Sequence, residues 1–129
     1  MLKLRLGAEV DMSPETFVWD RDTDIKIVGV PISKSITRYA MRKAGVTHDG
    51  TGIGVVSATY DTQVELCLAS FKSFEGLEDP DGKPLKVRRD TIEALINHDD
   101  GNDLLADAVV FFKELYDDRR SEREDAEGN

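Results

Sequence analysis

The residues whose side chains could do chemistry are few and widely separated in this chain of 129 residues. His48 and His98 each precede an aspartate, Asp49 and Asp99, in acidic stretches that are typical of loops. A histidine beside an aspartate can act as a general base only where a nucleophile and substrate-binding groups complete the site. Few groups of that kind are available here, so we interpret both histidines as solvated surface residues.

The single cysteine, Cys67, lies within an apolar pattern, where a thiol packs as a small hydrophobic side chain and is not a nucleophile. One cysteine and two histidines at such long separation match no zinc spacing. A single cysteine also allows no intramolecular disulfide, which fits a reducing cytosol.

Three aspartate-rich turns invite a calcium interpretation, but each lacks residues that a calcium-binding loop needs. After Asp20-x-Asp22-x-Asp24, the positions that an EF-hand reserves for glycine and for a bidentate glutamate hold Ile25 and Pro31. The turn centred on residue 82 lacks both anchoring carboxylates, since Leu77 and Arg88 occupy those positions, and the turn centred on residue 101 has Ile96 at the first. We therefore expect turn-forming, solvated aspartates and no catalytic, cofactor or metal site.

The N-terminal part of the chain predicts short strands followed by a helix. Residues 1–6 alternate leucine with a basic residue, the period of a half-buried strand. Residues 16–19 and 25–30 are rich in β-branched and aromatic side chains and predict a hairpin, which we prefer to a short helix beginning near Pro14. Ser33 then begins a helix that ends at Gly45.

Three further helices and one sharp turn are predicted. Residues 48–54 form a connecting loop, since their Gly-x-Gly-x-Gly pattern lacks the third glycine of a dinucleotide-binding loop. A helix follows over 59–75; another starts with Asp90 as its N-cap, and a fourth runs from Asn102 to at least Tyr116. Between them, residues 79–85 form a turn with Gly82 at positive φ. The predicted core residues are Leu68, Phe71, Leu95, Leu105 and Phe112.

These elements predict one α+β domain over residues 1–116, with a small N-terminal β-hairpin or three-stranded sheet packed on three to four helices. Residues 117–129 have almost no apolar side chains, and we expect a charged tail that frays from the last helix or is disordered. No apolar run is long enough to cross a membrane, and no signal peptide is evident, so we expect a soluble, cytosolic protein.

Charge is divided unevenly along the chain. Residues 1–45 hold eight Lys/Arg and six Asp/Glu, whereas residues 46–129 hold nine and twenty, which gives a formal net charge of −9. So acidic a molecule is repelled by a nucleic-acid backbone, and we expect no binding to nucleic acid.

Two surfaces are candidates for binding a partner. In the fourth helix the apolar arc, which includes Leu104, Phe111 and Leu115, is wider than one core contact requires. Either this helix is buried on two sides, or one edge of it meets another chain. On the first helix, Lys34, Arg38 and Arg42 form a basic ridge, which is either a solvated face or a contact for the acidic half of another copy in a homo-oligomer.

The segment from Phe71 to Leu85 resembles the middle of tail-assembly chaperones of tailed phages. The resemblance rests on Phe74-Glu-Gly-Leu77, on Asp79-Pro-Asp-Gly-Lys-Pro-Leu85 and on the capped helix that follows. It covers residues 16–115 loosely and 64–105 specifically. Relatives are expected to have Trp where Phe74 stands.

The resemblance implies a non-enzymatic protein of the host cytoplasm. Such proteins are thought to bind the long, apolar tape-measure protein while tail-tube subunits polymerise around it, so the implied partners are the tape-measure protein and the tail-tube protein. Two other classes stay open. One is a small virion structural protein, such as a head–tail connector or tail accessory. The other is an acidic inhibitor that mimics DNA, although the basic residues at 83–89 interrupt its carboxylate face.

Overall fold

The computed structural model describes residues 10–45 and 52–127, and it confirms the α+β class. Three strands, β1 (Glu15–Val18), β2 (Lys26–Gly29) and β3 (Phe71–Glu75), form one antiparallel sheet in the order β1-β2-β3. The helices are α1 (Lys34–Lys43), α2 (Gly52–Ser70), α3 (Arg89–Ile96) and α4 (Asp99–Glu127). The strand predicted over residues 1–6 lies outside the described residues.

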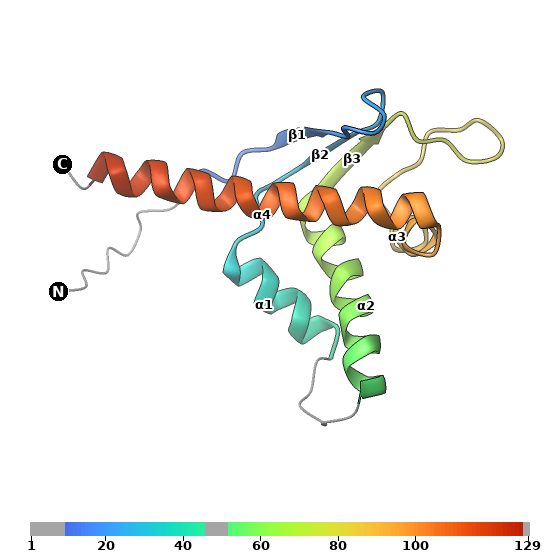
Figure 1. The fold of residues 1–129 in the computed structure, drawn as a ribbon, viewed down its shortest axis with the longest axis horizontal. Helices are drawn as coiled ribbons and strands as arrows, with labels where there is room; N and C mark the ends of the chain where they lie inside the picture. The colour runs from blue at the N-terminus through green and yellow to red at the C-terminus, as the bar shows by residue number, and fades with distance from the viewer. Residues whose placement is uncertain (1–9, 46–51, 128–129) are drawn as a thin grey trace.

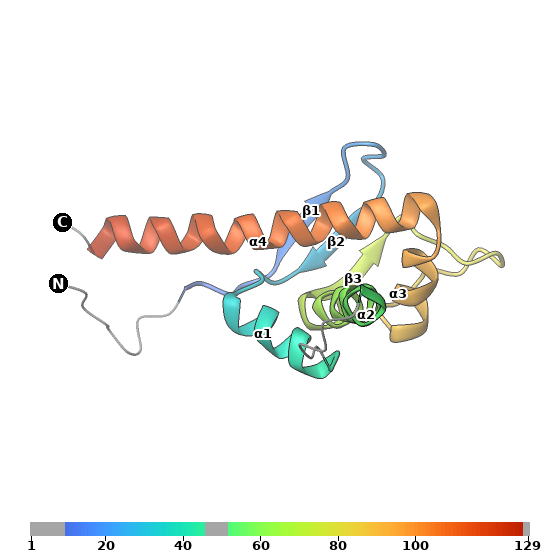
Figure 2. The ribbon, with the colours of Figure 1, turned by 60° about the horizontal axis from the view of Figure 1, so that its bottom comes forward.

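Helix α4 is the centre of the fold. Figure 1 shows the sheet on one side of α4 and helices α1 and α2 on the other, with α3 at the start of α4. The buried core draws side chains from every element of the fold, and Ile27, Phe71, Ile92 and Phe112 are at most 3% exposed. Figure 2 shows α4 extending past the sheet toward the C-terminus.

The predicted hairpin and first helix are confirmed. Phe17 of β1 pairs with Ile27 of β2, and the backbone N–H of Trp19 donates to the carbonyl of Ile25 across the turn (3.0 Å). Helix α1 begins where the hydroxyl of Ser33 accepts a hydrogen bond from the backbone N–H of Ile36 (3.1 Å). After α1 the chain passes through Gly45, whose φ is +71°.

The helix predicted over residues 59–75 is wrong at both ends, because α2 starts at Gly52 and residues 71–75 form β3. The error arose because Phe71 and Phe74 are three residues apart, a helical spacing. In β3 the register shifts, so that Gly29 pairs with Phe71 and Val28 with Ser73, and Lys72 is the extra residue. This irregularity brings both phenylalanines to the buried face of the sheet.

The remaining predictions are corrected at the helix starts. Arg88, not Asp90, is the N-cap residue of α3, and Asp90 lies in the first turn. Helix α4 begins at Asp99 instead of being capped by Asn102, and it continues beyond Tyr116 to Glu127. Of the predicted core residues, Phe71, Leu105 and Phe112 are buried, whereas Leu68 and Leu95 are partly buried and pack against the core.

The turn between β3 and α3 has the predicted chemistry. The carboxylate of Asp79 accepts hydrogen bonds from the backbone N–H groups of Asp81 and Lys83, both at 2.9 Å. Gly82 has a φ of +82°. Because the turn satisfies its own backbone groups, it is a structured element that joins the sheet to α3.

Candidate functional site

Helix α1 presents a basic stripe to solvent. Lys34, Arg38 and Arg42 follow one another at intervals of four residues, and all three are exposed. Met41 lies on the same side of the helix and is 41% exposed. No acidic residue occupies the first turn of α1, and within the described residues these three cations make no ion pair. We call these four residues the basic stripe.

The wide apolar arc of α4 is explained by burial on both sides. Leu104, Leu105, Ala108, Val109 and Phe112 are at most 4% exposed. Leu104 is therefore not available to a partner, which corrects the sequence-based assignment. Its side chain is enclosed because α4 runs between the sheet and the other helices (Figure 1).

Phe111 and Leu115 lie at the edge of that arc and remain half-buried. The ring of Phe111 contacts Phe17 of β1 at a centroid distance of 5.3 Å and Phe112 at 5.1 Å. One turn beyond Leu115, Arg119 donates hydrogen bonds to the backbone carbonyls of Asp11 and Ser13, both at 2.9 Å. These bonds hold the segment that leads into β1. We call Phe111, Leu115 and β1 the α4 rim.

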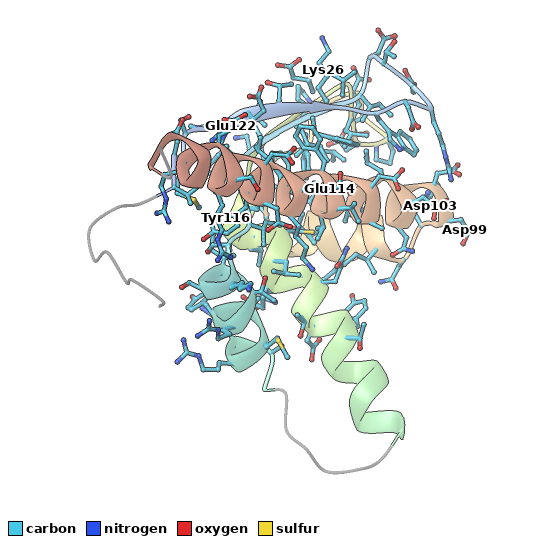
Figure 3. The ribbon with its side chains drawn as sticks, turned by 60° about the vertical axis from the view of Figure 1, so that its left-hand side comes forward. Lys26, Asp99, Asp103, Glu114, Tyr116 and Glu122 are labelled. Atoms are coloured by element: carbon cyan, nitrogen blue, oxygen red, sulfur yellow. The ribbon has the colours of Figure 1, made fainter. Side chains whose placement is uncertain are left out.

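The solvent side of α4 carries an acidic stripe. Its members recur at helical spacing around one exposed apolar residue, Val110, which is 53% exposed. Figure 3 shows Asp99, Asp103 and Glu114 along this helix. The acidic stripe consists of Asp99, Asp103, Asp107, Glu114 and Asp117, with Val110 among them.

Internal contacts fix two carboxylates of the acidic stripe. Arg21, in the hairpin turn, donates to Oδ2 of Asp103 (2.8 Å), and this contact raises the pKa of the guanidinium. The indole Nε1–H of Trp19 donates to Oδ2 of Asp107 (2.9 Å). Each of these contacts uses only Oδ2, and a carboxylate has a second oxygen that can accept.

The residues with potential chemistry are not brought together. His98 is exposed, and its Nδ1 accepts a hydrogen bond from the backbone N–H of Gly101 (3.2 Å) at the start of α4. Cys67 is fully buried, and burial raises the pKa of its thiol to about 12. His48 lies outside the described residues, and residues 10–45 and 52–127 contain no cluster of three or more potential metal ligands.

A shallow pocket of about 440 Å³ lies between the turn and the start of α3. Lys83, Lys86 and Arg88 line it together with Asp79 and Asp90, so charges of both signs face it. This mixed lining favours no single class of ligand.

The sequence indicated the three cations of the basic stripe, together with Phe111 and Leu115, but Met41 and the acidic stripe were missed. Asp103, Asp107, Val110 and Glu114 are spaced by four, three and four residues, and this periodicity is readable in the sequence. The contact between Trp19 and Asp107 has no sequence signal, because it depends on how the hairpin packs on α4.

Comparison with known proteins identified no relative of this chain. No family model, curated protein or solved structure matches the chain. Among the described residues, no helix is long and apolar enough to cross a membrane.

Proposed function

We propose that this protein is a non-enzymatic tail-assembly chaperone of a tailed phage, which binds an apolar segment of the tape-measure protein in the host cytoplasm. The proposal is supported by the resemblance of residues 71–85 to that family, and by the strongly acidic composition, which keeps a carrier of apolar clients in solution.

The observation that carries the proposal is the α4 rim. Phe111 and Leu115 are apolar and half-buried, and Phe111 contacts Phe17 of β1, which is an edge strand of the sheet. An aromatic residue that is already held by a neighbouring ring loses little conformational entropy when a partner covers it. Met12, 36% exposed, lies in the segment that Arg119 fixes beside the same part of α4. An apolar client segment would contact these side chains.

Co-expression with the tape-measure protein tests this proposal. Phe111→Gln and Leu115→Gln should each reduce co-purification of the tape-measure protein and increase its aggregation. Val110→Gln is the matched control, since Val110 adjoins Phe111 in sequence but faces solvent on the acidic stripe. Circular dichroism and thermal unfolding check that each variant is folded. Normal client recovery with both rim variants in a folded state would exclude the rim as the client site.

A virion structural protein, either a head–tail connector or a tail accessory, is the second candidate. The specific observation that favours it is the separation of the basic stripe on α1 from the acidic stripe on α4, because opposite charges on different elements suit repeated assembly. A structural protein stays in purified phage particles, whereas a chaperone is absent from them. Immunoblotting of purified particles separates the two functions.

A further inference from the structure

We propose that the basic stripe of one copy docks on the acidic stripe of α4 in a second copy of this chain. The observation behind this inference is that each stripe surrounds one exposed apolar residue, Met41 on α1 and Val110 on α4. Both residues are large hydrophobics left at the surface among charges, so covering each with the other removes apolar area from water.

The spacing of the two stripes matches when the helices run parallel. From Lys34 to Arg38 is four residues and from Arg38 to Met41 three; the same intervals separate Asp103, Asp107 and Val110. With a rise of about 1.5 Å per residue, both series place their members about 6 Å and 4.5 Å apart along the helix axis. The register therefore pairs Lys34 with Asp103, Arg38 with Asp107 and Met41 with Val110.

The antiparallel alternative fits less well. In the antiparallel register that sets Met41 opposite Val110, Lys34 meets Asp117, but Arg38 meets Lys113, a residue of the same charge. The parallel register also leaves Arg42 closest to Glu114 on the acidic stripe. With Met41 opposite Val110, the parallel register makes two opposite-charge pairs and the antiparallel register makes one.

Hydrogen bonds within the same copy already orient two carboxylates of the acidic stripe. Trp19 and Arg21 hold the carboxylates of Asp107 and Asp103 through Oδ2, which orients them and leaves Oδ1 for Arg38 and Lys34 of the other copy. The basic stripe has no internal partner among the described residues, so docking costs it no existing ion pair.

The contact joins different molecules. In Figures 1 and 2, α1 lies on the C-terminal side of the molecule, away from α3 and the start of α4, where Asp99 and Asp103 are found. Two different surfaces that complement each other give a heterologous contact, which propagates as a ring or a chain of copies. The contact is small and charged, so association should be weak and should weaken further as salt screens it.

Disulfide trapping tests whether Met41 of one copy lies opposite Val110 of another. Met41→Cys and Val110→Cys are made as separate variants, mixed and oxidised at low ionic strength, and the linked peptides are identified by mass spectrometry. Cys67 does not interfere because it is fully buried. We expect the 41–110 disulfide to exceed, at least about tenfold, the linkage of Met41→Cys with Ala94→Cys, a control at an exposed position on α3. Equal yields would overturn the proposal.

Exchanging charges between the two stripes tests the electrostatic part of the contact. These variants carry no introduced cysteine. Arg42→Glu and Glu114→Lys should each weaken self-association about threefold to tenfold in sedimentation equilibrium, and an equimolar mixture of the two should restore it. Lys86→Glu makes the same charge change as Arg42→Glu but at a site outside both stripes, and it should have little effect. Loss of association in the Lys86→Glu variant, no rescue in the mixture, or no association of the unaltered chain would each overturn the proposal.

This inference does not depend on the proposed client site. Arg42→Glu leaves Phe111 and Leu115 untouched, and the rim variants leave both stripes untouched. If Arg42→Glu abolishes self-association while client recovery is normal, the two surfaces are separate. Retention of the basic stripe by an anionic matrix such as heparin, without self-association, would assign it to another partner and overturn the proposal.

Discussion

The indole Nε1–H of Trp19 donates a hydrogen bond to Oδ2 of Asp107 over 2.9 Å, and this contact joins residues 88 positions apart in the chain. Trp19 is 5% exposed, and its single polar group is satisfied by a side chain of α4. Together with the ion pair between Arg21 and Asp103, the contact fixes the hairpin on the acidic side of α4.

Removing the carboxylate of Asp107 should destabilise the fold. Asp107→Ala leaves a buried indole N–H without a partner, and we expect a loss of about 1–3 kcal/mol in the free energy of unfolding. Asp107→Asn keeps a carbonyl acceptor and should lose less. Urea unfolding followed by the fluorescence of Trp19, the only tryptophan, measures both. Asp99→Ala, exposed on the same helix, is the control, and a loss as large there would argue against the hydrogen bond as the cause.

Gly29 should tolerate no side chain, because α4 passes too close. A Cβ at this position would lie 2.8 Å from Cζ of Phe112 and 3.0 Å from the carbonyl oxygen of Ser70. We expect Gly29→Ala to destabilise the fold by about 1–3 kcal/mol. Combining it with Phe112→Leu makes room for the new methyl group, so the two substitutions should cost less together than the sum of their separate effects in thermal unfolding. Strict additivity would show that the ring is not the obstacle.

Gly76, which precedes the 79–85 turn, and Gly82, which lies within it, should differ in sensitivity to substitution. Gly76 and Gly82 both have positive φ, but a Cβ at Gly76 would overlap the backbone carbonyl of Asp24, whereas nothing lies within 4 Å of one at Gly82. Gly82→Ala should therefore cost about 1 kcal/mol from conformation alone, and Gly76→Ala clearly more. Lys83→Ala, an exposed side chain in the same turn, should leave the melting temperature unchanged. A reversed order would mean that the turn is not a structural element.

The boundary placed at Tyr116 can be tested through Arg119. Its side chain is 14% exposed, hydrogen-bonds two backbone carbonyls of the segment before β1 and lies 3.6 Å from the carboxylate of Glu15. We expect Arg119→Ala to increase amide hydrogen exchange in residues 11–18 and to lower stability by about 1 kcal/mol or more. Lys113→Ala, an exposed change on the same helix, is the control. Unchanged exchange would support a domain that ends at Tyr116.

The sequence was sufficient for features whose cause is local. Ser33 as an N-cap, Gly45 and Gly82 at positive φ, and the hairpin are set by neighbouring residues. The assignment of residues 71–75 failed because a strand needs a partner, and the paired residues of β2 are 42 to 49 positions earlier in the chain. The candidate site divides in the same way. The basic stripe is local to α1, whereas the burial of Leu104 and the contact of Phe111 with Phe17 depend on packing against the sheet.

Cys67 should be unreactive in the folded protein. It is fully buried, and burial raises the pKa of its thiol from an ordinary 9.0 to about 12. Labelling with a thiol-reactive disulfide at pH 8 should be slow and should accelerate in urea with the same midpoint as global unfolding. Rapid labelling without denaturant would contradict the burial of this side chain.

The same raised pKa makes stability depend on alkaline pH. Above pH 9 the unfolded chain releases the thiol proton that the folded protein retains, so the unfolded state binds fewer protons and the free energy of unfolding falls as pH rises toward about 12. The contribution of the buried, neutral thiol is therefore fully present at neutral pH. Cys67→Ala removes this titration, and its stability should decline less steeply between pH 9 and 11 than that of the unaltered protein. Parallel slopes for the two proteins would show that other groups cause the alkaline loss.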